Sequence, residues 1–343
     1  MKIGIIGLGK MGSAIATRLA QGDHDVIGYD PHVKITINRV KQVDALQAIT
    51  QQEIIWLMVP AEAIDKILQE LTPHLIEKNI LKGCARPDAS STLSTKGCAR
   101  PDASSTLSTK GCARPELVEG YEYRSELDNP IIIDGGNSFY KDSKRRASTL
   151  AKSNIFYLDC GTSGGIHGLK DGFCLMIGGN EDAFKKAEPI FETIAAKDGY
   201  ALVGPSGAGH YVKMVHNGIE YALLQSYAEG FSILHASRQF PHLNLEQISG
   251  LWMHGSIIRS FLLELTHEIF KEKIDFNKIK GIIGESGTGR WAQEEANLLG
   301  LNTPALESAL KTRKESQIKG DSFTMKLIAL LRNKFGGHPV EKE

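Results

Sequence analysis

The sequence predicts an α/β protein in which a domain with a parallel, doubly wound sheet is followed by an all-α domain. In the first half, short apolar runs alternate with segments of helical periodicity, the pattern of a parallel sheet covered on both faces. A glycine-rich turn follows the first of these runs. From Ala208 onward the pattern is helical almost throughout. We expect the boundary in the Gly204–Gly207 stretch, which gives domains 1–205 and 206–343.

The individual elements follow from the same periodicity. Runs rich in apolar residues predict these strands: Lys2–Ile6, Asp25–Tyr29, Ile54–Val59, Pro130–Asp134 and Ile155–Asp159. Helical spacing predicts helices at about Gly12–Gly22 and Ala61–Leu75.

Charge and composition exclude several classes of protein. The 40 lysines and arginines balance 40 aspartates and glutamates, so the chain has no general attraction to nucleic acid or membranes, and an anion site must be built locally. No apolar run is long enough to span a bilayer, and glycines interrupt the N-terminal run where a secretory signal would continue. The five cysteines show neither paired nor zinc-type spacing. We expect a cytoplasmic protein without a metal.

One segment stands apart from this pattern. Residues 82–95 read KGCARPDASSTLST, and residues 96–109 repeat them identically before a third copy diverges. The composition is poor in large apolar residues, so the segment cannot offset its ordering entropy by burial. Three cysteines are copies carried by this repeat, and no second ligand type accompanies them. We interpret residues 82 to about 126 as a disordered surface insertion.

The first turn has the spacing of a dinucleotide site. Residues 7–12 read GLGKMG and fit GxGxxG between a strand and a helix, which predicts a Rossmann-type domain. Its candidate residues are Gly7, Leu8, Gly9, Lys10, Met11 and Gly12. Asp30 ends the second strand, where a carboxylate accepts hydrogen bonds from ribose and repels a 2′-phosphate, so NAD is favoured over NADP. Alternatively, Asp30 only begins a turn before Pro31, and His32 and Lys34 offset the repulsion.

The segment 207–230 carries the chemistry. As a helix, it places five polar groups on one face, at i, i+3, i+4, i+7 and i+8: Lys213, His216, Asn217, Glu220 and Tyr221. A base that accepts a hydroxyl proton and an acid that returns a proton later suit dehydrogenation, provided that the lysine is neutral. Met214, Val215, Ile219, Leu223 and Leu224 lie mostly elsewhere and can pack. A solvated ion-pair face is the alternative interpretation.

Several motifs together resemble the 6-phosphogluconate dehydrogenases, within the wider β-hydroxyacid dehydrogenase group. The matching stretches span most of the chain outside the repeat: GLGKMG at Gly7, IDGGNSFY at Ile133, GTSGGIHGLKDG at Gly161, GHYVKMVHNGIEY at Gly209, SGTGRW at Ser286 and LRNKFGGH at Leu331. The HNGIEY sequence separates this family from its hydroxyacid relatives.

The resemblance implies the roles of individual residues. Lys213 would be the general base and Glu220 the general acid in the oxidative decarboxylation of 6-phosphogluconate. Val59, Pro60, Ala61 and Asn137 would lie along the cofactor. The substrate would contact Asn137, Ser163, Gly164, Gly165, His216, Asn217 and Tyr221. Arg313, Arg332 and His338 would bind its phosphate.

The sequence departs from the long form of the family at two points. The long form has a lysine where Ser286 aligns, so Arg290 is a candidate for the missing charge. It also has a duplicated helical domain, whereas this chain has one copy and resembles the short, often NAD-linked form. In the family the C-terminal tail enters the neighbouring protomer, so we expect a homodimer or homotetramer whose tail reaches outward from Gly336-Gly337.

Three alternatives stay open at this level. Another β-hydroxyacid dehydrogenase or semialdehyde reductase would need neither Arg332 and His338 nor a carboxyl group at Glu220. A non-catalytic nucleotide-binding sensor would not need Lys213. A folded enzyme impaired by the repeat is the third.

Overall fold

The computed structural model describes residues 1–34, 36–84, 129–285 and 287–342. Its N-terminal part is built on an eight-stranded sheet with the order β3-β2-β1-β4-β5-β6-β7-β8. Neighbouring strands are parallel except β6 and β7, which are antiparallel, so the predicted parallel sheet is interrupted at one junction. The strands are β1 (Lys2–Ile6), β2 (Asp25–Tyr29), β3 (Val40–Gln42), β4 (Ile54–Leu57), β5 (Ile131–Asp134), β6 (Phe156–Ser163), β7 (Phe173–Gly178) and β8 (Ala195–Gly204).

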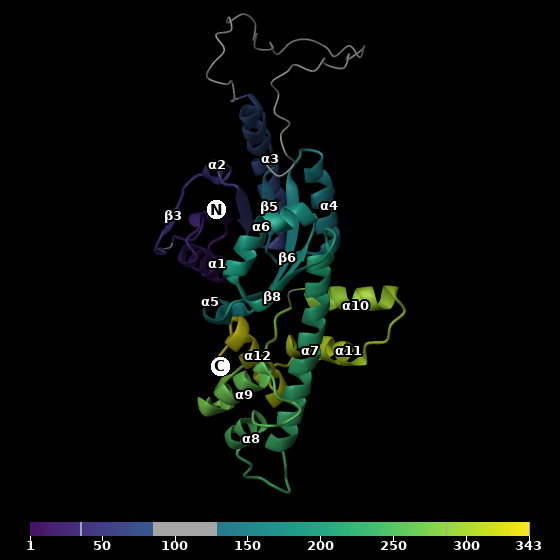
Figure 1. Cartoon of the computed structure of the whole chain (residues 1–343). Coiled ribbons are helices and arrows are strands. Elements are labelled where there is room, and N and C mark those ends of the chain that lie inside the picture. The colour runs from purple at the N-terminus through teal and green to yellow at the C-terminus, as the bar shows by residue number, and fades with distance from the viewer. Residues whose placement is uncertain (35, 85–128, 286, 343) are drawn as a thin grey trace, which may run out of the picture.

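Helices cover both faces of this sheet, as the sequence predicts (Figure 1). One face packs against α1 (Lys10–Gln21) and α6 (Glu181–Ile194), through side chains such as Leu19 and Phe191. The other face packs against α3 (Ala61–Cys84) and α4 (Tyr140–Ala151), through side chains such as Leu68. Because both faces are buried, the central strands are apolar at nearly every position.

The helical part is organised around α7 (Ala208–His235), a long helix that begins against the sheet and runs away from it (Figure 1). The remaining helices are α2 (Leu46–Ile49), α5 (Gly168–Asp171), α8 (Leu245–Trp252), α9 (Phe261–Lys271), α10 (Thr288–Leu298), α11 (Pro304–Ser316), α12 (Phe323–Gly336) and the short 3₁₀ turns η2 (Gly165–His167) and η3 (Phe276–Lys278). A separate apolar core joins α7, α9 and α12, so this part has its own stabilising burial.

The structure also shows elements that the sequence analysis missed. Strand β3 has only three residues, and the polar stretch Lys197-Asp198-Gly199 interrupts β8 before its apolar part. Strand β7 was also missed, although its sequence FCLMIG is apolar. Helix α3 extends to Cys84, beyond the predicted end at Leu75. The predicted insertion lies almost entirely outside the described residues. No helix in the described part of the chain has the length and apolarity that a membrane span requires.

The strand order places the site. The order reverses between β1 and β4, and in such sheets ligands bind outside the carboxyl ends of the strands at this switch point. The turn Gly7–Gly12 follows β1, Asp30 follows β2, Val59–Ala61 follow β4 and Asn137 follows β5. Most of the predicted cofactor residues therefore share one edge of the sheet.

Candidate active site

The glycine turn after β1 has the shape that a dinucleotide needs. Gly7 has a φ of +94°, a conformation that favours glycine. A Cβ added to Gly12 would lie 1.9 Å from the carbonyl oxygen of Gly7, so only glycine lets α1 start this close to the turn. A Cβ on Gly9 would meet nothing within 4 Å. The turn thus leaves open space at the N-terminus of α1, where a pyrophosphate is favoured.

Asp30 supports this turn. Its carboxylate accepts a hydrogen bond from the backbone N–H of Leu8 at 2.7 Å, and from those of His32 and Val33 at 2.8 and 3.0 Å. A carboxylate offers about four acceptor sites, so capacity remains for a ribose hydroxyl. The structure therefore shows that Asp30 organises its own turn and the start of the glycine turn, and its contact with a ribose stays a prediction.

Two loops form the other side of the predicted cofactor site. Val59 and Pro60 connect β4 to α3, whose first residue is Ala61, and Asn137 is exposed in the loop between β5 and α4. A Cβ added to Gly136 would lie 2.9 Å from the carbonyl oxygen of Val59. The two loops are therefore in close contact, and residues from both reach the same edge of the sheet.

Helix α7 is anchored so that Lys213 faces the sheet. Asp159 on β6 accepts hydrogen bonds from the backbone N–H groups of Gly207 and His210, at 2.6 and 2.9 Å. Gly161 has no Cβ, and one added there would lie 2.4 Å from Cβ of Lys213. The absence of side chains at this crossing lets the amino-terminal part of α7 lie directly on β6.

The predicted polar face of α7 forms a connected group. The Nζ atom of Lys213 lies 3.4 Å from Nδ1 of His216, which lies 3.1 Å from Oδ1 of Asn217. On the other side of the imidazole, Nε2 lies 3.3 Å from Oγ of Ser163, next to Gly164 and Gly165. The helix thus joins the predicted base to the predicted substrate turn after β6.

The pKa values of the two candidate catalytic groups move in opposite directions. Burial lowers the pKa of Lys213, although the negative charge of Glu220 opposes the shift. Burial raises the pKa of Glu220, against the positive charges of Lys213, Arg313 and Arg332. A lysine that loses its proton more readily and a carboxyl group that keeps it longer suit a base and an acid respectively.

A group of cations lies beyond Glu220. The guanidinium carbon of Arg313 is 3.3 Å from the ring centroid of Tyr221, and its Nη1 donates to the carbonyl oxygen of Gly284. Its Nη2 is buried without a partner in the described structure. The positive charge of Arg332 is close enough to Glu220 to lower the pKa of that carboxyl group. Burial is the largest cause that lowers the pKa of His338, to about 4, and the charges of Arg332 and Arg313 add to it. Such a concentration of positive charge fits an anionic ligand.

The tail folds back onto its own chain, which corrects the expectation that it reaches outward. Gly337 ends α12 with a φ of +63°, and its carbonyl oxygen accepts a hydrogen bond from Nζ of Lys10 at 2.9 Å. His167 lies 3.1 Å from the carbonyl oxygen of Lys334 through Nε2. The glycine pair supplies a turn, and Arg332 and His338 lie near Glu220 and Arg313 of the same chain.

Two positions remain from the sequence analysis of the phosphate site, Arg290 and Ser286. Arg290 lies at the start of α10 with its side chain 60% exposed and 3.9 Å from Glu294, and no described contact brings it to the cations around Arg313. Ser286 lies outside the described residues. Thr288, two residues further on, accepts a hydrogen bond from Nδ2 of Asn217 at 3.2 Å, so the start of α10 does reach the polar face of α7.

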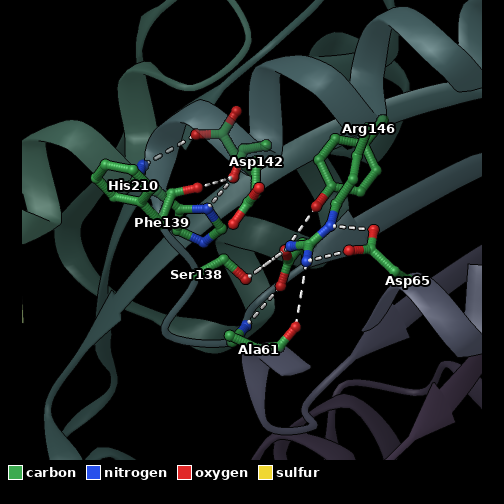
Figure 2. Close-up of polar contacts among 12 residues, drawn as sticks. Ala61, Asp65, Ser138, Phe139, Asp142, Arg146 and His210 are labelled. Atoms are coloured by element: carbon green, nitrogen blue, oxygen red, sulfur yellow. Dashed lines mark hydrogen bonds and ion pairs between the residues drawn. The ribbon is translucent and has the colours of Figure 1, made fainter. Parts of the chain in front are cut away.

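A buried network behind the two cofactor loops escaped the sequence analysis. Figure 2 shows the guanidinium of Arg146 between Asp65, Ala61 and Ser138. Helical periodicity could have indicated that Arg146 is buried, because Ser143, Arg146 and Leu150 are spaced to share one face of α4. All three are buried in the structure. No group of three or more potential metal ligands occurs within the described ranges.

Comparison with known families agrees with this geometry. The model of the 6-phosphogluconate dehydrogenase C-terminal domain matches residues 209–341, and that of the NAD binding domain of 6-phosphogluconate dehydrogenase matches residues 124–204. Residues 2–82 match the family described as NADP oxidoreductase, coenzyme F420-dependent.

Individual proteins match over most or all of the chain. The Bacillus subtilis protein YqeC is 37% identical over 343 residues, 100% of both chains. The NAD(+)-dependent, decarboxylating 6-phosphogluconate dehydrogenase of Haloferax volcanii is 33% identical, over 100% of this chain and 99% of the relative. The solved 6-phosphogluconate dehydrogenase of Plasmodium falciparum superposes with a TM-score of 0.67 at 26% identity, over 93% of this chain and 62% of that longer one.

Proposed function

This chain belongs to the 6-phosphogluconate dehydrogenase family, and we propose that it converts 6-phosphogluconate to ribulose 5-phosphate and carbon dioxide with reduction of NAD(P). One observation carries the proposal. Lys213 and Glu220 lie on one helix with oppositely shifted pKa values, near the positive charges of Arg313 and Arg332 and the imidazole of His338. This combination supplies a base, an acid and a binding site for the substrate phosphate.

The first step is oxidation at the third carbon of the substrate. Neutral Lys213 accepts the proton of the hydroxyl group, and its lowered pKa favours the neutral form. A bound nicotinamide would take up the hydride from the same carbon. His216, held between Lys213 and Ser163, orients the hydroxyl and carboxylate groups.

The second step is loss of the carboxylate. The bond between the first and second carbons breaks, and its electron pair moves toward the new ketone, which becomes an enolate. Protonated Lys213 stabilises this oxygen. Glu220 then donates a proton to the second carbon, and the proton that Lys213 took from the hydroxyl restores Glu220. Their mutual electrostatic influence is consistent with this return. The ketone acts as the electron sink, so the proposed reaction requires no metal.

Steady-state kinetics with 6-phosphogluconate and each cofactor test the proposal and the role of Asp30 together. Because a carboxylate repels the 2′-phosphate of NADP, we expect kcat/KM to be higher with NAD. Asp30→Ala should lower the efficiency with NAD and narrow the difference. A preference for NADP of about tenfold, or about 1.4 kcal/mol, contradicts the cofactor assignment. If 6-phosphogluconate reduces neither NAD nor NADP in the presence of the protein, the proposed dehydrogenase function is contradicted.

The pH profile tests the assignment of Glu220. The base must be neutral and the acid protonated, so loss of the Lys213 proton favours activity and loss of the Glu220 proton opposes it. Because burial raises the pKa of Glu220, its deprotonation should begin to oppose activity only above the range of an ordinary carboxyl group. Glu220→Gln should remove this effect of Glu220 from the pH profile and slow decarboxylation more than hydride transfer. A variant in which both steps slow equally would assign Glu220 to binding instead.

We also propose a homodimer or homotetramer. Apolar side chains follow one exposed stripe along α7: Val212, Val215, Ile219, Leu223 and Ile233. The sequence analysis expected Val215, Ile219 and Leu223 to pack together with Met214 and Leu224. Within this chain only Met214 and Leu224 of these five side chains are buried. An apolar stripe beside the catalytic face is well placed for a second copy of the chain.

A further inference from the structure

The buried network around Arg146 joins the two loops that line the proposed cofactor site (Figure 2). Arg146 is 3% exposed and lies on α4. Its Nε and Nη2 donate to the carboxylate of Asp65 in the second turn of α3, at 2.9 and 3.3 Å. Its Nη2 also donates to the carbonyl oxygen of Ala61 at 3.1 Å. One end of the guanidinium thus holds the start of α3, directly after the loop that follows β4.

The other end of the guanidinium holds the loop that follows β5. Nη1 of Arg146 lies 3.2 Å from Oγ of Ser138, the residue next to Asn137, and 3.5 Å from Oδ2 of Asp134. That carboxylate, which is fully buried, also accepts hydrogen bonds from Ser138 at 2.8 Å, from Tyr157 at 2.5 Å and from the backbone of Gly136 at 3.1 Å. Both ends of the loop are therefore tied to a single charge centre.

The charges in this network are strongly held. Burial alone would lower the pKa of Arg146, but Asp65, Tyr157 and Asp134 raise it above its ordinary value. The hydrogen bond from Arg146 is the largest cause that lowers the pKa of Asp65, to about 2. Because loss of Arg146 would leave the fully buried carboxylate of Asp134 without its cationic partner, the guanidinium has little freedom to move.

We propose that Arg146 is a positioning residue that fixes the distance between Val59–Ala61 and Asn137. It thereby determines where the nicotinamide end of the cofactor binds. This inference depends on the proposed function for the placement of the cofactor. A planar fork with several donors can bind Asp65, Ala61 and Ser138 at once, whereas a single ammonium group cannot span them. Misplacement of reacting groups by about 1 Å can cost about 100-fold in rate.

The neighbouring arginine gives a matched control. Arg145 also binds Asp65, at 2.8 Å, and Asp142, but its side chain is 54% exposed and no described hydrogen bond joins it to either cofactor loop. Arg146→Lys and Arg145→Lys therefore remove the same chemical group from the same helix and the same carboxylate. Only the first change loses the contacts with Ala61 and Ser138.

The experiment measures NADH affinity by fluorescence, then kcat, and the thermal midpoint of both variants. We expect Arg146→Lys to bind NADH about tenfold more weakly and to lose about 10- to 100-fold in kcat, while Arg145→Lys keeps the values of the unaltered enzyme. Inhibition by inorganic phosphate, which needs only the cations near Arg313, should be the same in both. If Arg146→Lys keeps the NADH affinity and kcat of the unaltered enzyme, the proposal is overturned. This holds even if the thermal midpoint of the variant falls.

A gentler change covers the case in which Arg146→Lys does not fold. Ser138→Ala removes one hydroxyl that joins Arg146 and Asp134 to the residue beside Asn137. It should lower kcat several-fold without a comparable loss of thermal stability, and kinetics identical to those of the unaltered enzyme overturn the proposal. NADH binding is measured without substrate, so a failure of the proposed reaction is seen separately, as unaltered enzyme that binds NADH but does not oxidise 6-phosphogluconate.

Discussion

Replacement of Lys213 by methionine is expected to lower kcat by about 10³- to 10⁴-fold, because the hydroxyl proton then has no acceptor. Methionine has a similar length and tolerates burial, so the packing of α7 on β6 should survive. NADH binding should also survive, since the glycine turn and Asp30 lie on other elements. Stopped-flow measurement of hydride transfer with 6-phosphogluconate tests this result directly.

A surface lysine provides the comparison. Lys185 pairs with Glu181 on α6 and is 62% exposed, so Lys185→Met makes the same substitution away from the catalytic face of α7. Its turnover should match that of the unaltered enzyme. A Lys213→Met enzyme with near-normal turnover would be incompatible with the proposed mechanism, and loss of NADH binding would show that the substitution disturbs more than the proton transfer.

Replacement of Arg332 by alanine is expected to cost about 100-fold or more in kcat/KM, because a buried charged partner of the substrate phosphate is lost. The effect should fall mainly on KM, as a phosphate far from the reacting carbons is bound equally before and during the reaction. Arg290→Ala is the informative comparison, since its guanidinium is exposed and pairs with Glu294. A larger loss at Arg290 than at Arg332 would support the sequence-based expectation that Arg290 supplies the charge missing at Ser286.

The same variant decides which chain completes each site. In the structure Arg332 and His338 approach Glu220 and Arg313 of their own chain. A mixture of Arg332→Ala and Lys213→Met proteins, after verified subunit exchange, should therefore stay inactive, because no site then contains both intact groups. If activity reappears, the tail of one protomer serves the site of its neighbour.

The sequence predicted most of the sheet but not all of it, for identifiable reasons. Strands β1 and β2 have the predicted bounds, because buried parallel strands require apolar residues and the glycine turn marks where β1 ends. Strand β8 escaped because its Lys197-Asp198-Gly199 stretch is polar, as befits an edge strand that meets solvent. Strand β7 was within reach of the same criterion, because FCLMIG is an apolar run, but its antiparallel direction was not, since strand direction is set by connections rather than by composition.

The candidate site shows the same division. The face of α7 was predictable, because helical spacing alone brings Lys213, His216 and Glu220 together. The path of the tail was not, because a glycine pair permits an outward extension and a turn equally well. The contact of Gly337 with Lys10 joins residues that are 327 positions apart, and no local pattern predicts it. Arg146 was within reach of the periodicity argument, but its partner Asp65 was not.

Helix α3 places the start of the repeat segment far from the cofactor edge of the sheet. It begins with Ala61 at the cofactor edge and ends with Cys84, so its 24 residues extend over roughly 36 Å toward the opposite edge of the sheet (Figure 1). The chain is next described from residue 129 and enters β5 at Ile131, the end of that strand remote from Asn137. The register of β5 with β4 and β6 is regular. We therefore expect that gain or loss of one 14-residue unit of the repeat leaves the spatial arrangement of Ala61, Asp134 and Arg146 unchanged.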